Sequence, residues 1–118
     1  MKFLKEWEMT AKEKLQLEEL YEHYNYRCFV CGEPANQRAH IIGNTNLNRK
    51  LFGQGVVNNP LNWLPVCSLE CNKLCDVGRN EKAERIAIVI NSAMFYEEKR
   101  EGIETIVKEN ITERKQNG

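Results

Sequence analysis

The chain of 118 residues lacks any long hydrophobic run, and it lacks an excess of charge of either sign. No apolar stretch approaches the roughly 20 residues that a membrane-spanning helix needs, so we expect no membrane partner. The first ten residues, MKFLKEWEMT, alternate charged and aromatic side chains without an apolar core, and no secretory signal is expected from them. Basic and acidic residues number 17 each, so the total charge indicates no particular partner.

The composition is that of one globular domain. Hydrophobic residues make up 42% of the chain and charged residues 29%, which excludes a disordered protein. A chain of this length fits a single domain, residues 1–118. Five cysteines without a visible signal favour a reducing compartment, so we expect a cytoplasmic protein whose thiols hold metal rather than form disulfides.

Charge is unevenly distributed along the chain. Residues 36–73 contain four basic side chains and one acidic one, a local net charge of +3. The basic residues are Arg38, Arg49, Lys50 and Lys73. Such a segment could face a phosphate backbone, although a chance fluctuation on a solvated surface explains the charge equally simply.

Two helical regions are predicted on either side of an irregular centre. Thr10-x-x-Glu13 has the form of a capping box and predicts a helix over about 10–25. Asn80 resembles a second N-cap, followed by apolar residues at helical spacing over about 80–112. Gly102 is expected to weaken or break this second region. Apolar helix faces of this kind usually pack in the hydrophobic core of a protein.

The centre, about 26–80, has a different composition. It holds all five cysteines, five of the seven glycines and all three prolines. Two short apolar runs, 39–42 and 63–66, predict brief strands. The polar, Asn-rich stretch between them, 43–61, is long enough to predict a functional loop.

The spacing of the cysteines predicts a metal site. Cys28-x-x-Cys31 followed by Gly32 is a zinc-knuckle spacing, because two intervening residues let both sulfurs reach one ion and glycine permits a left-handed turn. A second pair, Cys67-x-x-x-Cys71, can complete the site if one thiol ends a strand and the other begins a helix. Four thiolates hold Zn²⁺ tetrahedrally in a closed, structural site.

The fifth cysteine leaves an alternative open. Cys75 lies four residues after Cys71 and could compete with it as the fourth ligand. Two unrelated pairs of buried thiols are the other explanation of the pattern.

Polar residues around the cysteines indicate a function. His40 lies in a strand-like apolar run, where a polar ring needs a hydrogen-bond partner or a chemical role. Asn62 precedes the second cysteine pair, and Asn72 directly follows Cys71. The order Cys-x-x-Cys, His40, Asn62, Cys-x-x-x-Cys-Asn72 resembles the HNH nuclease family over about 26–80, roughly half of the chain.

The resemblance implies an α+β fold: a small ββα-metal, treble-clef-like core stapled by zinc and flanked by the N- and C-terminal helices. It implies that His40 is the general base, that Asn62 braces the hairpin loop, and that Asn72 is a ligand of a catalytic Mg²⁺ or Mn²⁺. The four structural zinc ligands would be Cys28, Cys31, Cys67 and Cys71. The implied activity is hydrolysis of DNA phosphodiester bonds to give 5′-phosphate and 3′-hydroxyl ends.

The chain departs from the family pattern at one position. Many members have Asp or another metal ligand directly before the histidine, whereas this chain has Ala39. Asp76, four residues after Asn72, is the substitute that helical spacing offers. A solvated helix charge explains Asp76 equally well.

Three functions therefore remain in view. A metal-dependent DNA endonuclease with one site per chain favours nicking by a monomer. A zinc-stapled nucleic-acid-binding module that no longer cleaves is the alternative that Ala39 suggests. A zinc-dependent interaction domain would instead use the apolar helix predicted over 80–99.

Overall fold

The computed structural model describes residues 9–117, so the expectation that the first residues carry no secretory signal lies largely outside it. Along the chain the elements follow in the order α1 Ala11–His23, β1 Gln37–His40, α2 Asn46–Phe52, α3 Gln54–Val57, η2 Pro60–Asn62, β2 Trp63–Val66, α4 Leu69–Cys75, α5 Glu81–Asn91 and α6 Tyr96–Asn117. Within these residues no helix combines the length and the apolar character that crossing a membrane requires.

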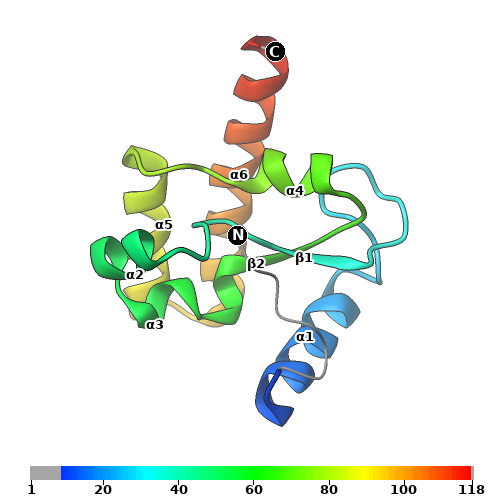
Figure 1. Cartoon of the computed structure of the whole chain (residues 1–118), viewed down its shortest axis with the longest axis horizontal. Helices are drawn as coiled ribbons and strands as arrows, with labels where there is room; N and C mark the ends of the chain where they lie inside the picture. The colour runs from blue at the N-terminus through cyan, green and yellow to red at the C-terminus, as the bar shows by residue number, and fades with distance from the viewer. Residues whose placement is uncertain (1–8, 118) are drawn as a thin grey trace.

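The fold is a small α+β domain around a two-stranded antiparallel hairpin. Figure 1 shows the hairpin at the centre, with α4 on one side of it and α1 on the other. The strands pair from Gln37 opposite Val66 to His40 opposite Trp63. A hairpin of this size is not stable alone, so the helices supply the apolar surface that holds it.

The second strand coincides with its predicted range, 63–66, whereas the first is shifted from 39–42 to Gln37–His40. The ladder ends after His40 because the next pair forms only one of its two bonds: the N–H of Ile41 donates to the Asn62 carbonyl, whereas the Ile41 carbonyl accepts from the N–H of Val77. Burial therefore explains why 41–42 is apolar, although these residues belong to no strand.

The predicted loop over 43–61 is instead mostly helical, which corrects the sequence-based expectation. It contains α2, α3 and the short 3-10 helix η2. Its polar residues cap these helices: the Thr45 hydroxyl accepts from the N–H of Asn48, and the Asn59 side chain accepts from the N–H of Leu61. Asparagine and threonine are common in loops and at helix starts alike, which is why composition alone misassigned the segment.

The carboxy-terminal helical region is broken at 92–95 and not at Gly102. At the end of α5 the Ser92 hydroxyl donates to the Val89 carbonyl. Gly102 lies within α6, where an added Cβ would come within 3.9 Å of a Val89 methyl group. That distance is an ordinary van der Waals contact, so the packing of α5 on α6 does not require glycine here, and Gly102 interrupts no helix.

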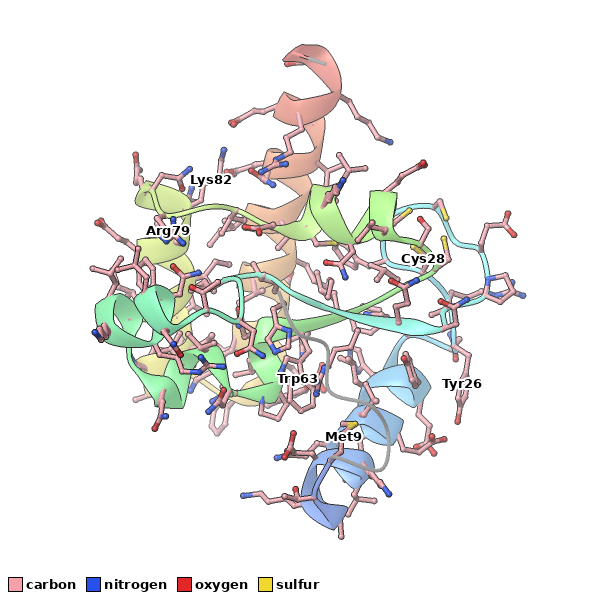
Figure 2. The ribbon with its side chains drawn as sticks, in the orientation of Figure 1. Met9, Tyr26, Cys28, Trp63, Arg79 and Lys82 are labelled. Carbon is pink, nitrogen blue, oxygen red and sulfur yellow. The ribbon has the colours of Figure 1, made fainter. Side chains whose placement is uncertain are left out.

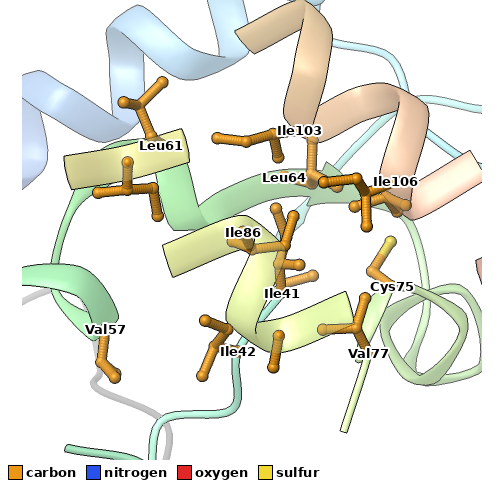
Figure 3. Close-up of a cluster of buried hydrophobic side chains, with 14 of the residues drawn as sticks. Ile41, Ile42, Val57, Leu61, Leu64, Cys75, Val77, Ile86, Ile103 and Ile106 are labelled. Carbon is orange, nitrogen blue, oxygen red and sulfur yellow. The ribbon is translucent and has the colours of Figure 1, made fainter. Parts of the chain in front are cut away.

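One hydrophobic core joins the hairpin to the helices, as Figure 3 shows. Ile41 and Leu64 lie against side chains from α5 and α6, among them Ile86 and Ile103. Ala39 belongs to the same cluster and is fully buried. Ala83, Ile86 and Ile90 of α5 are thus buried in this chain's own core, whereas Ile88 and Phe95 in the range 80–99 are exposed.

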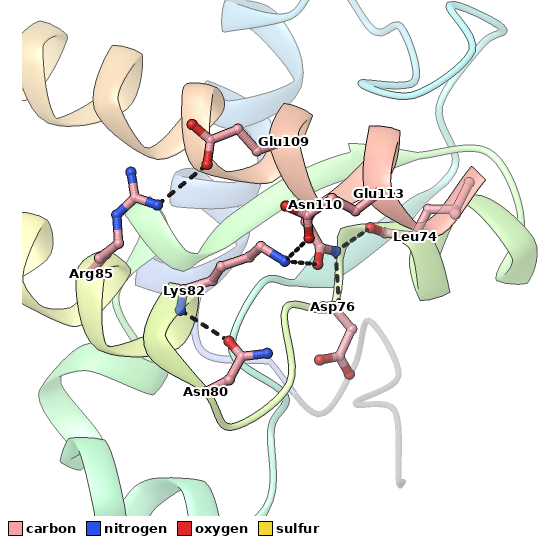
Figure 4. Close-up of polar contacts among 8 residues, drawn as sticks. All are labelled: Leu74, Asp76, Asn80, Lys82, Arg85, Glu109, Asn110 and Glu113. Atoms are coloured by element: carbon pink, nitrogen blue, oxygen red, sulfur yellow. Dashed lines mark hydrogen bonds and ion pairs between the residues drawn. The ribbon is translucent and has the colours of Figure 1, made fainter. Parts of the chain in front are cut away.

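Two buried polar side chains of α6 connect distant segments. Arg100 is almost fully buried and donates to the carbonyls of Pro60, Leu61 and Trp63, so it holds the turn that leads into β2. Asn110 donates to the carbonyls of Leu74 and Asp76 at the end of α4, as Figure 4 shows. Arg100 thus adds a donor to the Pro60 carbonyl, which also accepts from the N–H of Trp63, and Asn110 joins α6 to the end of α4.

Candidate metal centre and basic cleft

The four cysteines of the two predicted pairs meet at one point. The sulfurs of Cys28, Cys31, Cys67 and Cys71 all lie within 4.8 Å of one another. Within residues 9–117 they form the only group of three or more His, Cys, Asp or Glu side chains that could hold a metal.

The distances fit a tetrahedral ion. Zn–S bonds of about 2.3 Å place the sulfurs of a tetrahedral site about 3.8 Å apart. The Sγ atoms of Cys31 and Cys67 are 3.4 Å apart, and those of Cys67 and Cys71 are 3.8 Å apart. The group is therefore consistent with one structural Zn²⁺, which all four thiolates would enclose.

The local backbone explains how the two pairs reach each other. Gly32 has a φ of 80° and its N–H donates to the carbonyl of Cys28, which is the left-handed turn predicted behind the first pair. Cys67 directly follows β2, and the Ser68 side chain accepts from the N–H of Cys71 at the start of α4. Burial of Cys28 opposes its ionisation, but backbone N–H groups at 30, 31 and 67 outweigh it and lower the pKa of this thiol to about 7.

Cys75 is the cysteine left out of the group. It is fully buried in the hydrophobic core, and burial raises the pKa of its thiol to about 12. An apolar surrounding disfavours the thiolate that binds metal, so Cys75 acts as a small hydrophobic side chain. This placement resolves the alternative that the spacing left open.

A cleft of about 1220 Å³ lies away from the cysteines, between the start of α1, the hairpin and the segment from α2 to η2. Figure 2 places Trp63 near the middle of the molecule and Cys28 toward one side. The charged groups that line the cleft are Lys12, Glu13, Arg38 and Arg49, so basic groups outnumber acidic ones. Glu13 is engaged in the capping box, where its carboxylate accepts from Thr10.

His40 lies in this cleft between two arginines. Arg38 precedes it by two residues on β1 and so lies on the same face of the strand, while Arg49 reaches the cleft from α2. The imidazole meets the Trp63 ring edge to face, with centroids 6.4 Å apart. Burial lowers the pKa of His40 to about 4, and the positive charges of Arg38 and Arg49 add to the shift. His40 is therefore neutral at pH 7 and can accept a proton.

This shift predicts that His40 makes the protein less stable in acid. Between about pH 6.5 and 4 the unfolded chain binds the histidine proton and the folded chain does not, so the free energy of unfolding falls as the pH falls. The decrease in the free energy of unfolding reaches roughly 3 kcal/mol in acid, and no such decrease is expected above pH 6.5. Urea denaturation at pH 7.5, 5.5 and 4.5 should show a smaller acid loss for His40→Ala than for the wild type. Equal losses for the two proteins would contradict the shift.

The exposed His23 provides the control for this measurement. The His23→Ala protein should lose stability with falling pH as the wild type does, because it retains the buried His40.

Asn62 lies directly before β2, and its side chain contacts the segment that follows β1. Its side chain is fully buried, with Oδ1 accepting from the N–H of Ile42 and Nδ2 donating to the carbonyls of Ile42 and Val57. These bonds join the segment after β1 to the residue before β2. Asn62 thereby holds the end of the strand that carries His40.

Asn62→Asp is expected to destabilise the fold by about 3 kcal/mol or more, because two buried carbonyls lose their donor and a charge enters an apolar site. Asn59→Asp is the matched control, since Asn59 uses only its side-chain oxygen, as an acceptor, and aspartate retains it. Urea unfolding of both variants at pH 7.5 measures the difference. Similar stabilities would show that the Asn62 donors contribute little.

The other predicted site residues lie outside the cleft. Asn72 is buried on α4, and its Nδ2 has no hydrogen-bond partner among residues 9–117. Asp76 caps the end of α4 in an extended conformation instead of continuing the helix, and its carboxylate accepts from the N–H of Gly78. Lys50 and Lys73 are exposed and do not line the cleft.

The structure also explains the alanine before His40. Residues 39 and 40 point to opposite faces of β1, so Ala39 faces the core while His40 faces the cleft. A carboxylate at position 39 would be buried among apolar side chains. Within residues 9–117, no cluster of carboxylates accompanies His40 as a ready site for a catalytic ion.

Trp63 is the cleft residue that sequence reasoning missed. It was assigned only to a strand, yet its ring lies under the Arg38 guanidinium, with Cζ 4.5 Å from the ring centroid. The register that places it opposite His40 could have indicated this role.

Comparison with known proteins yields no match to a family, to a curated protein or to a solved structure.

Proposed function

We propose that the chain is a metal-dependent DNA endonuclease of the HNH type, which nicks one strand with His40 as the general base. The observation that carries the proposal is a neutral histidine in a basic cleft, placed there by a hairpin that a buried asparagine braces. The four-cysteine group supports it as a zinc staple for the same ββα unit.

The proposed step is hydrolysis of a phosphodiester. A water molecule would lose its proton to His40 while its oxygen attacks phosphorus, and the bond from phosphorus to the 3′ oxygen would break. The 3′ oxygen then takes a proton from solvent, and the other product carries a 5′-phosphate. Arg38 and Arg49 would hold the negatively charged strand, since their charges face the cleft.

The proposal includes a divalent ion, because the charge of a phosphodiester repels an attacking oxygen nucleophile. When bound, Mg²⁺ or Mn²⁺ would neutralise charge on the phosphate and the leaving oxygen. The resemblance names Asn72 and Asp76 as the side chains that would hold it. Neither lines the cleft with His40, so these two residues do not fit an ion held beside the proposed base.

A non-cleaving module that binds nucleic acid is the second candidate. The buried Ala39 favours it, because that position offers no ligand beside His40. Such a module would use the same basic cleft and would retain the zinc staple.

Incubation of supercoiled plasmid with purified protein tests the proposal. With added Mg²⁺ or Mn²⁺ we expect open-circular DNA, and without added divalent ion we expect none. If plasmid stays supercoiled while the protein retards it in a gel, the endonuclease proposal is wrong and the binding module takes its place. If neither effect is seen, both are wrong.

A further inference from the structure

We propose that Arg38 and Trp63 form a subsite that binds one phosphodiester of the nucleic-acid strand in the cleft. This inference rests on the proposed function. The inference adds Trp63 to the proposed site. It also assigns a ligand to the N–H donors of Arg38 and Trp63 that have no hydrogen-bond partner.

Two hydrogen-bond donors in the cleft are buried without partners. Nη1 of Arg38 and Nε1 of Trp63 make no hydrogen bond within the part of the chain that the structure describes. Trp63 is only 2% exposed, and both residues line the cleft that holds His40. A buried donor without a partner loses the free energy of its bonds to water, so an unfilled pair in one place points to a ligand.

The chemistry of the two groups selects an anion. Guanidinium and indole N–H groups only donate, so their shared partner must be an acceptor. The guanidinium lies over the indole ring, which holds it in place and leaves its N–H groups to the ligand. The carboxylate of Glu13 in the same cleft accepts from Thr10, and neither Nη1 of Arg38 nor Nε1 of Trp63 donates to it.

The surroundings favour a polyanion over a single carboxylate. Arg49 and Lys12 line the same cleft, and Asn44 and Asn46 accept from Arg49. A strand that meets Arg38 and Trp63 at one phosphate would therefore meet further basic groups along the cleft. His40 lies two residues from Arg38 and opposite Trp63, so the phosphate would be held next to the proposed base.

Two substitutions separate the parts of the subsite. In buffer without added divalent ion and without chelator, we expect Trp63→Phe to weaken binding to a DNA duplex about tenfold, with an unchanged dependence on salt, because it removes a donor but no charge. Arg38→Gln should weaken binding and also reduce the slope of log K against log salt by about 0.9. Zinc content and thermal unfolding establish that each variant is folded.

Arg27→Gln is the matched control, since Arg27 is exposed outside the cleft. If Arg38→Gln and Trp63→Phe bind DNA as this control does, the subsite and the strand contact given to Arg38 are wrong, while cleavage with His40 as the base is judged by the plasmid assay. If the wild type itself does not bind DNA, the proposed function and the subsite both fail.

A direct measurement keeps the subsite testable if either variant misfolds. The chain has two tryptophans, so an NMR spectrum of the wild type should show two indole N–H signals. A short DNA oligonucleotide should shift the Trp63 signal downfield, as expected for a new hydrogen bond. The other signal is identified by replacing Trp7 with phenylalanine.

Other anions test whether the subsite is selective for a phosphate within a nucleic-acid strand. Inorganic phosphate at the same phosphate concentration should shift the Trp63 signal far less, because it lacks the contacts to the rest of the cleft. An equal shift with free phosphate would assign the subsite to a small anion and overturn the proposal. An equal shift of the Trp63 signal with a glutamate-rich peptide would also overturn the proposal.

Discussion

Replacing His40 with alanine should reduce the rate of plasmid nicking by about 10²- to 10⁴-fold, the usual contribution of a general base. The reason is that His40 is the only histidine in the cleft and is neutral at pH 7, so it can take the proton of the attacking water. Binding of DNA should be almost unchanged, because a neutral imidazole adds no charge to the contact. The measurement is the rate of open-circle formation with Mg²⁺ or Mn²⁺, together with DNA affinity without them.

His23→Ala is the matched control for this prediction. The chain has two histidines, and His23 is exposed on α1 outside the cleft, so its replacement should leave nicking unchanged. Nicking by His40→Ala at the wild-type rate would exclude His40 as the base. A rate that falls equally in both variants would point to a loss of folded protein instead.

Loss of the metal is expected to have the largest effect on stability. Structural zinc contributes about 10–16 kcal/mol of binding free energy in small zinc domains, and this energy is coupled to folding. The Cys71→Ala protein should therefore retain much less than one zinc per chain and unfold at a much lower temperature. Zinc content by mass spectrometry and thermal unfolding by circular dichroism measure both effects, and a zinc chelator should unfold the wild type likewise.

Cys75→Ala provides the control, because Cys75 lies one helical turn from Cys71 but outside the sulfur group. It should keep one zinc per chain and lose only about 1–2 kcal/mol, from the small cavity left in the core. If Cys75→Ala loses the metal and Cys71→Ala keeps it, the assignment of the fourth ligand is reversed.

The four-cysteine group and the cleft lie at opposite ends of the same hairpin. The backbone next to Cys28 is joined to the end of β2, since the N–H of Phe29 donates to the Pro65 carbonyl. The other end of the hairpin carries His40 and is held by Asn62. Contacts from the cysteine segment and from the asparagine therefore hold the two ends of the hairpin that carries the histidine.

Several features could be predicted because they depend on neighbours in the sequence. The capping box at Thr10 is present as predicted, since both of its partners lie within one helical turn. The range 63–66 is a strand as predicted, because a short apolar run of this kind is typical of a buried strand. The cysteine group was predictable because metal geometry restricts the spacing of each pair, even though 35 residues separate the pairs.

Other features could not be predicted because they depend on contacts between distant segments. Arg100 has the sequence context of a surface helix residue, and only the fold shows that it fills a pocket of carbonyls 37 to 40 residues away. Gly102 predicts a helix break, but it lies within α6, which continues through it beside Val89 of α5. Residues 43–61 have a loop-like composition, yet packing stabilises short helices that would not form alone.

In the candidate site, too, some features follow from neighbouring residues and others from contacts between distant segments. The residue types could be read from the amino-acid sequence: one histidine, two arginines and an asparagine around a hairpin, with four cysteines of zinc-binding spacing. Packing of the folded chain places Arg38, Arg49 and Trp63 with His40 in one cleft, leaves Lys50 and Lys73 outside it, and buries Cys75 in the core. Local patterns specify caps, strands and metal ligands, whereas the composition of a cleft depends on how separate elements pack together.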